Sequence, residues 1–179
     1  SVVTQYLVKH ELARGPLSAA VRPAAAPDVA DIVAMSAKSQ RALCEANAQM
    51  WKPHPDAPAR FAAWMTYSLT LVDRRIFVSS EGDQGGFVIA QPVSPFHMPL
   101  SSARGHMGLI DDFWAASFAA TEAANGSQAR DLLNAAEIEF GRRGMTSAML
   151  ICPAAWPAKN RSVRSHGYRD GTTWMLKGA

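Results

Sequence analysis

The run from His106 to Gly144 contains a strand pattern and a helix pattern, separated by a connection rich in small residues. Its first part, His106–Trp114, carries enough apolar bulk to predict a strand. An Ala-rich connection follows, and then the turn signal Asn125-Gly126-Ser127. Gly144 comes directly after two arginines, as expected of a glycine that ends a helix. Between the turn and Gly144, apolar residues recur at spacings of three and four and predict a helix: Ala129, Leu132, Leu133, Ala136 and Phe140.

The start of this predicted helix is a candidate anion site. The first amides of a helix have no partner within the helix, and the helix dipole places partial positive charge at the same end. A phosphate bound at Gly126–Ala129 would therefore be stabilised. An ordinary capped helix that follows a strand explains the same residues, and both interpretations stay open at this point.

The composition is that of a folded globular chain, because 48% of the 179 residues are hydrophobic and 18% are charged. This length favours one domain with one core. No apolar run reaches about 18 residues, the length of a membrane span, and no basic segment followed by an apolar stretch opens the chain. Cys44 and Cys152 lie far apart, which favours buried thiols over a disulfide or a metal site. We therefore expect a cytoplasmic protein with no membrane partner.

The charge and histidine patterns argue against two other classes of function. The formal net charge is +3, and no basic stripe with interleaved aromatic residues predicts nucleic-acid binding. The five histidines show no metal-ligand spacing, so no metal is expected. A group of basic residues late in the chain suits either a phosphorylated ligand or a solvated surface: Arg142, Arg143, Lys159, Arg161, Arg164, Arg169 and Lys177.

The predicted elements form a mixed order of strands and helices. Residues 1–16 predict an N-terminal helical appendage, because Val3 and Leu7 are four residues apart and Gly15-Pro16 would end a helix. Residues 17–179 predict one α+β (mixed α/β) domain, with a central, twisted, mostly antiparallel sheet flanked by helices. Its clearest unit is a hairpin in which a glycine-rich turn joins the strands 75–81 and 87–93. The remaining predicted segments are strands at 17–23, 146–152 and 172–176, and helices at 27–38, 59–72 and 158–165.

These elements, in this order, resemble the GNAT-type N-acetyltransferase superfamily from about Ala20 to Lys177. No single element is specific, and the resemblance rests on six of them in sequence. The matching stretches are Val21–Ala24 with Pro27–Ile32 (first strand and helix), Ile76–Pro92 (second and third strands), Leu109–Phe113 (fourth strand), Leu132–Gly144 (main cofactor helix) and Gly167-Tyr168 (glycine-aromatic pair).

The resemblance implies an N-acyltransferase that binds acetyl-CoA, or another acyl-CoA, between its fourth and fifth strands and transfers the acyl group directly to an amine. The pantetheine arm would lie along Phe113, Trp114 and Ala115. The far end of the cofactor would lie near Asn160. The backbone amides that would hold the pyrophosphate are those of Gly126, Ser127, Gln128, Ala129 and Arg130. The residues that would surround a small amine acceptor are Trp51, His54, Trp64 and His97.

The chain departs from the family pattern at three positions. Ala124 stands where a basic residue or glutamine usually begins the phosphate loop, and Ser127 replaces a glycine. Val163 stands where many members carry a tyrosine that protonates the leaving thiolate. The alternative function is therefore a GNAT-folded acyl-CoA-binding or regulatory module with weak or no transferase activity.

Three carboxylates are candidates for the general base that removes a proton from the amine: Asp111, Asp112 and Glu81. Asp111 and Asp112 are adjacent in a predicted strand and should point to opposite faces. A strand-end charge bonded to backbone or solvent explains each carboxylate as well. His166 is interpreted as a surface histidine, with the role of the missing acid as the alternative. A second copy of the chain, forming a homodimer, is a further candidate partner.

Overall fold

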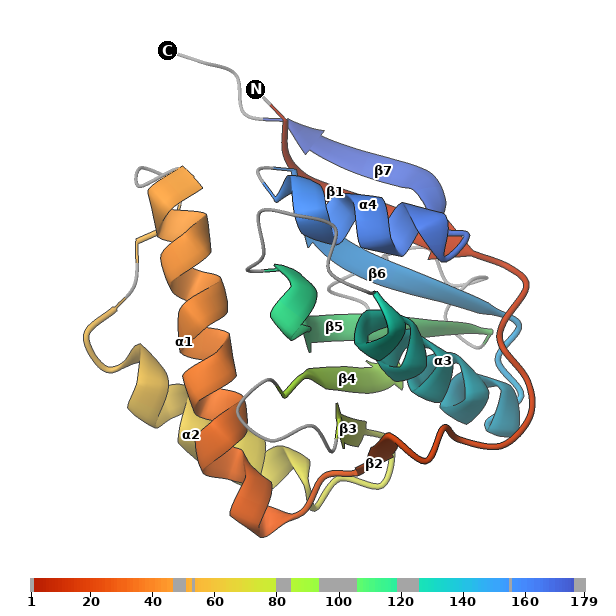
Figure 1. The fold of residues 1–179 in the computed structure, drawn as a ribbon, viewed down its shortest axis with the longest axis horizontal. Coiled ribbons are helices and arrows are strands. Elements are labelled where there is room, and N and C mark those ends of the chain that lie inside the picture. Colours follow the sequence, from red (N-terminus) through yellow and green to blue (C-terminus); the bar gives the residue numbers. More distant parts are fainter. Residues whose placement is uncertain are drawn as a thin grey trace.

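Seven strands form one mixed sheet among the residues that the structure describes (Figure 1). The computed structural model describes residues 2–46, 51–52, 54–79, 85–93, 106–118, 126–154 and 156–175. The strand order is β2-β3-β4-β5-β6-β1-β7, and neighbouring strands are antiparallel except β5 and β6, which are parallel. The strands are β1 (Val2–Lys9), β2 (Val21–Pro23), β3 (Arg75–Ser79), β4 (Phe87–Pro92), β5 (Met107–Trp114), β6 (Ser147–Pro153) and β7 (Arg169–Met175).

Helices flank this sheet, and the predicted α+β domain is confirmed. α3 packs on β2 to β6, α4 contacts β6, and α1 and α2 pack on each other near the β2 end of the sheet (Figure 1). Within the described ranges, no helix is both long enough and apolar enough to cross a bilayer. The helices are α1 (Val29–Ala46), α2 (Ala57–Ser68), α3 (Ser127–Arg142) and α4 (Pro157–Ser165), with the short 3-10 helices η1 (Ala26–Asp28) and η3 (Ala116–Phe118).

The N-terminal segment is a strand, so the helix predicted within residues 1–16 is wrong. β1 lies inside the sheet, between β6 and β7, and pairs antiparallel with both. Leu7 is fully buried in the main core, whereas Tyr6 and Val8 pack against a second apolar cluster. Both faces of β1 therefore carry apolar residues, and the sequence shows no strict alternation. The segment belongs to the sheet and is not an appendage to it.

β5 and α3 form as their sequence patterns predict. The apolar stripe of α3 is fully buried, with Leu132, Leu133 and Ala136 at 0% exposure. Phe140 of the same stripe packs on Gly108 of β5, where a side chain would overlap the phenyl ring. Gly144 ends the helix with a φ of 79°, a backbone conformation that glycine adopts without strain. This packing fixes α3 across the middle of the sheet.

A buried carboxylate fastens α3 to both ends of the chain. Glu137 of α3 is fully buried and accepts hydrogen bonds from Lys9 Nζ (2.9 and 3.1 Å) and from the Ala13 amide (2.7 Å). Its Oε1 also lies 3.2 Å from His166 Nε2. Burial alone would raise the pKa of Glu137, but hydrogen bonds involving His166, Lys9 and Ala13 outweigh it and lower that pKa. His166 has a side chain only 10% exposed, so its interpretation as a surface histidine is wrong.

Candidate functional site

The parallel strands β5 and β6 pair along only part of their length. Their register runs from Met107 opposite Ser147 to Ile110 opposite Leu150. β5 then continues to Trp114, and β6 continues to Pro153, without further pairing between them. The last residues of β5 therefore present an edge that β6 does not cover.

A β-bulge lies where the pairing with β6 ends. On the other side of β5, Val88 pairs with Phe113 and Ala90 pairs with Ile110, so Ile89 faces both Asp111 and Asp112. Bulges of this kind re-aim side chains and are frequent beside active sites. The bulge returns Phe113 to the face of Ile110, and both residues belong to the main core.

The two aspartates of this bulge, both candidates for the general base, have different hydrogen-bond partners. Asp111 accepts a hydrogen bond from Gln91 Nε2 at 3.3 Å, and its charge helps to raise the pKa of Tyr6, after burial of the phenol. Asp112 accepts a hydrogen bond from the Phe113 amide at 2.8 Å and lies near Lys159 of α4. Both carboxylates follow Ile110, the last residue of β5 that pairs with β6, and Asp112 is the one near Lys159. Glu81, the third candidate base, lies outside the described residues.

The backbone of Phe113 is engaged by side chains where the β5–β6 ladder has stopped. Its amide donates to Asp112, and its carbonyl oxygen accepts a hydrogen bond from Lys159 Nζ at 2.7 Å. Lys159 is only 4% exposed, so of the two interpretations given for the late basic residues, the solvated surface is wrong for this one. Burial lowers the pKa of the Lys159 ammonium, and the nearby Asp112 and Cys152 partly oppose this effect.

Aromatic side chains surround the Lys159 ammonium and fill the space beside β5. Its Nζ lies 5.5 Å from the ring centroid of Phe113, 5.9 Å from that of Phe118 and 5.6 Å from that of Trp156. Trp156 donates a hydrogen bond from Nε1 to the Phe118 carbonyl at 3.2 Å and packs on Trp114 at 5.5 Å between centroids. The predicted pantetheine-binding residues Phe113, Trp114 and Ala115 thus line a buried, largely aromatic surface.

The predicted pyrophosphate site lies at the start of α3, beyond the end of β5. The helix begins after Gly126, which supplies no side-chain cap. Ser127 and Arg130 are exposed, whereas Ala129 is fully buried. The Gln128 side chain is buried too. Its Oε1 accepts a hydrogen bond from the Ala116 amide (2.9 Å), and its Nε2 donates one to Ser79 Oγ (3.0 Å). Gln128 therefore ties the start of α3 to the sheet. Residues 119–125, which include Ala124, lie outside the described ranges.

Asn160 links α4 to the end of β6. Its Nδ2 donates to the carbonyls of Pro153 and Trp156, both at 2.9 Å. Its Oδ1 is buried, and no hydrogen-bond partner for it occurs in the described part of the chain. The role of Asn160 in cofactor binding stays a prediction.

Two of the four predicted acceptor residues meet in one cavity. Trp51 and His54 line a space of about 260 Å³ between the end of α1 and the start of α2, together with Cys44. The Cys44 thiol donates to the Trp51 carbonyl at 2.6 Å and holds this segment against α1. Trp64 lies elsewhere, stacked on Phe61 and beneath the Arg74 guanidinium at 4.6 Å. His97 falls outside the described residues.

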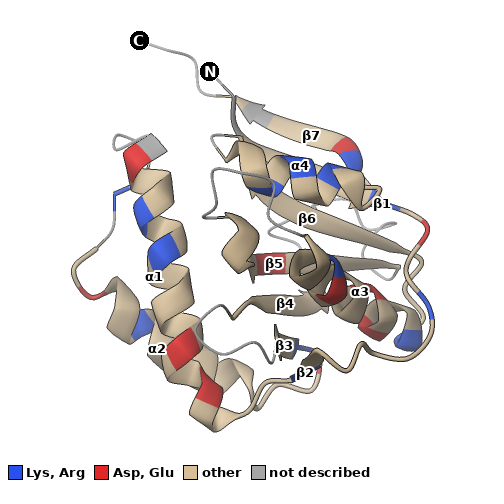
Figure 2. Ribbon diagram, viewed as in Figure 1, with Lys and Arg blue, Asp and Glu red and all other residues tan. Residues whose placement is uncertain are grey.

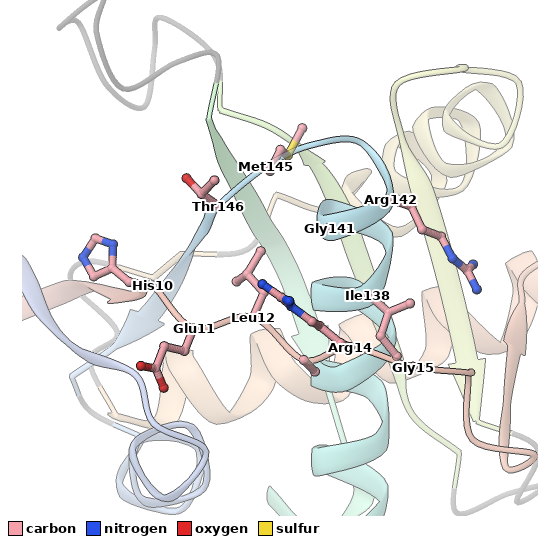
Figure 3. Close-up of a pocket in the computed structure, with 11 residues that line it drawn as sticks. His10, Glu11, Leu12, Arg14, Gly15, Ile138, Gly141, Arg142, Met145 and Thr146 are labelled. Atoms are coloured by element: carbon pink, nitrogen blue, oxygen red, sulfur yellow. The ribbon is translucent and has the colours of Figure 1, made fainter.

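A larger cavity of about 740 Å³ lies at the other end of α3 and holds none of the predicted site residues (Figure 3). It lies between the connection that follows β1 and the C-terminal half of α3, and Arg142 points away from His10 and Glu11. Its lining residues are His10, Glu11, Leu12, Ala13, Arg14, Gly15, Ile138, Gly141, Arg142, Met145 and Thr146.

The late basic residues that the structure describes do not gather into one anion site, and Lys177 lies outside the described ranges. Basic residues lie on α4 and at the C-terminal end of α3 (Figure 2). Arg143 forms an ion pair with Glu139 at 2.8 Å, and Arg164 forms one with Asp170 at 2.6 Å. Lys159 is buried. Much of this charge is thus neutralised locally, as on an ordinary surface.

Solved structures with this arrangement of elements include acetyltransferases. A predicted acetyltransferase from Clostridium acetobutylicum, crystallised with acetyl-CoA, has a TM-score of 0.63 and 16% identity over 88% of this chain and 94% of its own. A protein from Novosphingobium aromaticivorans assigned to the GNAT family has a TM-score of 0.54 and 11% identity, over 96% of this chain and 61% of its own. The chain has the GNAT fold. No protein-family model and no curated protein matches it in sequence.

A third protein with the GNAT fold acts on a known class of amine. It is an aminoglycoside acetyltransferase from an uncultured soil metagenomic sample, solved in complex with sisomicin. Its TM-score to this chain is 0.56, with 10% identity over 89% of this chain and 95% of its own. At such identities the likeness establishes the GNAT fold, and the individual site residues rest on the geometry of this chain.

Sequence reasoning did not select two residues that dominate this geometry, Lys159 and Trp156. Val163 is fully buried on α4, and Lys159 precedes it by four residues. Residues four apart share one helix face, so the spacing alone placed Lys159 on the buried side of α4. That signal was outweighed by the general expectation that a lysine near a helix start is solvated.

Proposed function

We propose that the protein is an acyl-CoA-dependent N-acyltransferase of the cytoplasm that transfers an acetyl group from acetyl-CoA to a small amine. The observation that carries this proposal is the edge of β5 beyond Ile110, where pairing with β6 ends at a bulge. The start of α3, with no side-chain cap, follows β5 in the chain. An extended pantetheine arm suits an uncovered strand edge, and a pyrophosphate suits a helix start.

In this proposal the residues of β5 and α3 hold the cofactor. Phe113, Trp114 and Ala115 line the pantetheine arm, and the amides from Gly126 to Arg130 face the pyrophosphate. Acetyl-CoA, when bound, supplies an activated thioester carbonyl. Asp112 is the preferred general base, because it lies near Lys159 of α4, whereas Asp111 is bonded to Gln91.

The proposed acceptor is a small amine that enters beside Trp51 and His54. These residues line a cavity of about 260 Å³, and the Trp51 ring offers a favourable surface for an ammonium group. The aminoglycoside acetyltransferase with the same fold supports an amine of small-molecule size, although its own substrate belongs to that protein.

A second function is favoured by one specific contact. The Phe113 carbonyl, proposed to face the pantetheine arm, already accepts a hydrogen bond from Lys159 at 2.7 Å. A cofactor that lies there must displace this ammonium, which weakens binding by the free energy of that contact. The second candidate is therefore an acyl-CoA-binding module with little or no transfer to small amines.

Calorimetry with acetyl-CoA, followed by a thiol-release assay over a panel of amines, tests both functions. Saturable binding with amine-dependent release of CoA supports the transferase. Binding with no release above the amine-free rate supports the module. The absence of binding at high micromolar acetyl-CoA contradicts both, and CoA without the acetyl group serves as the control for contacts made by the nucleotide and the pantetheine arm.

A further inference from the structure

The chain places an amine of its own at the edge where the pantetheine arm of the acyl-CoA is proposed to lie. Lys159 extends from α4, and its Nζ reaches the Phe113 carbonyl at 2.7 Å, directly after the bulge of Asp111 and Asp112. The side chain is 4% exposed and is enclosed by aromatic rings. A lysine in such surroundings has lost the hydration that an ammonium group prefers, so its burial carries a free-energy cost. A functional role for this amine would account for that cost.

We propose that Lys159 is an acyl-acceptor site, and that the protein transfers the acyl group of a bound acyl-CoA to the Nζ of its own Lys159. The inference rests on the proposed acyl-CoA site at the edge of β5. It assigns to this chain a covalent modification that does not need the small amine acceptor.

The reaction balances with the groups already named. The Lys159 ammonium first loses one proton, for which the carboxylate of Asp112 is the nearby acceptor and solvent the final one. The neutral amine then attacks the thioester carbonyl carbon, so that an N–C bond forms and the C–S bond breaks. CoA leaves as a thiolate and takes up the second proton from nitrogen. The products are N-acyl-Lys159, CoA with a free thiol, and one released proton.

The surroundings favour both the nucleophile and the product. Burial lowers the pKa of Lys159, against the opposing charges of Asp112 and Cys152, and so increases the fraction of neutral amine. An acylated Lys159 keeps one N–H, which is able to donate to the Phe113 carbonyl as the ammonium does. The modification removes a buried charge and adds apolar atoms beside Phe118 and Trp156. The site is therefore suited to the acylated form of the lysine.

Mass spectrometry of the full chain after incubation with acetyl-CoA tests the proposal. We expect one acetyl group per chain, mapped to Lys159 and stable to hydroxylamine, as an amide is. Lys38, an exposed lysine of α1, is the internal control, and acetylation at Lys159 should exceed it by about tenfold or more. Lys159→Arg should abolish the modification, and Lys38→Arg should leave it unchanged. A label on Cys152, released by hydroxylamine, or equal labelling of all lysines overturns the proposal.

A second thioester separates this inference from the proposed function. S-acetyl-N-acetylcysteamine carries the same reacting group without the nucleotide, so it needs no pyrophosphate site. Acetylation of Lys159 by this small thioester but not by acetyl-CoA supports the nucleophile and contradicts the acyl-CoA site. Calorimetric binding of acetyl-CoA with an unmodified Lys159 in both incubations overturns the inference and leaves the proposed function intact. These readings use the wild-type protein, so they hold even where Lys159→Arg fails to fold.

Discussion

The Nζ of Lys159 donates a 2.7 Å hydrogen bond to the carbonyl oxygen of Phe113, a residue 46 positions earlier in the chain. The carbonyl lies beyond the last paired residues of β5 and β6, so the bond joins α4 to β5 where β6 no longer pairs with it. A buried carbonyl without a partner would be destabilising by about 1–3 kcal/mol, and the lysine removes that penalty. The Lys159 side chain therefore supplies the hydrogen bond that the Phe113 carbonyl lacks, and it occupies the edge of β5 that the cofactor is proposed to use.

Lys159→Met should change how stability depends on alkaline pH. Burial holds the pKa of Lys159 below its ordinary value of 10.5 in the folded protein. As pH rises through the folded pKa, the folded protein loses this proton while the unfolded chain retains it. The wild-type free energy of unfolding should thus increase by about 1.4 kcal/mol per pH unit until the ordinary pKa is reached. Urea unfolding at a series of pH values from neutral to alkaline measures this increase in the free energy of unfolding.

The methionine variant serves as the reference for that experiment. Methionine fills a similar volume between Phe113 and Trp156 and carries no titrating proton. Tyr168, whose pKa burial raises well above 10.0, titrates in both proteins and cancels in the difference. A wild-type curve parallel to that of Lys159→Met would show that Lys159 keeps its proton across the whole range.

Ser127→Glu should weaken acetyl-CoA binding by about tenfold or more, because it adds a negative charge where the pyrophosphate is proposed to lie. Ser127 is exposed at the first position of α3, and an acidic residue there is favourable to the helix itself. Loss of binding with an unchanged melting temperature is therefore the expected result in calorimetry and thermal unfolding. Ser127→Gln has the same size without charge and should bind nearly as the wild type does. Equal affinity of both variants would place the pyrophosphate elsewhere.

Glu137→Gln should destabilise the protein by about 3–5 kcal/mol, because it removes one charge from a buried pair with Lys9. The matched control is Glu139→Gln on the same helix, where the pair with Arg143 is less buried and the expected loss is about 1 kcal/mol or less. Denaturant unfolding of the three proteins measures the difference. Similar losses for the two variants would mean that the buried Glu137 network contributes no more to the free energy of unfolding than the Glu139–Arg143 pair does.

The contribution of the Glu137 carboxylate to the free energy of unfolding should also disappear at acidic pH. The folded pKa of Glu137 lies below its ordinary value of 4.5, so the stabilisation is fully present above that value. It is lost as pH falls through the lowered folded pKa, where the carboxylate takes up a proton. Wild type and Glu137→Gln should therefore converge in stability toward strongly acidic pH, as followed by circular dichroism across an acid titration.

Gly108→Ala should destabilise the fold by about 1–3 kcal/mol through overpacking, because the new methyl group would overlap the Phe140 ring. Gly141, one residue after Phe140 in α3, has open space around the position of a side chain. Gly141→Ala should instead stabilise the protein by about 0.5–1 kcal/mol through helix propensity. Opposite shifts of the melting temperature are expected, and a shared sign would contradict the packing of β5 against α3.

The sequence predicted the elements whose faces differ in polarity. α3 has one apolar stripe against the sheet, and the β3–β4 hairpin is bounded by glycines and prolines, so periodicity and turn residues were sufficient. β1 lacks such a signal because Leu7 packs on one face and Tyr6 and Val8 on the other. A short segment with both faces buried is not distinguishable from a helix by spacing alone, and only its neighbours β6 and β7 decide it.

Local sequence pattern located β5 and the start of α3, the two elements of the candidate site. The placement of a cofactor between the fourth and fifth strands came from the family resemblance and stays a prediction. The contact between Lys159 and Phe113 joins segments distant in sequence, and the bulge at Asp111 and Asp112 depends on the register with β4. Such contacts follow from tertiary packing, which a single sequence does not encode in any local signal.

The place of β1 between β6 and β7 has a consequence for the growing polypeptide on the ribosome. Val2–Lys9 is synthesised before either of its partners, which comprise Ser147–Pro153 and Arg169–Met175. Until those segments emerge, β1 has both hydrogen-bonding edges free and both apolar faces uncovered, as an aggregation-prone strand does. Completion of the sheet must therefore wait until residues 169–175 have been synthesised, and a nascent chain that stalls before β7 would leave one hydrogen-bonding edge of β1 without its strand partner.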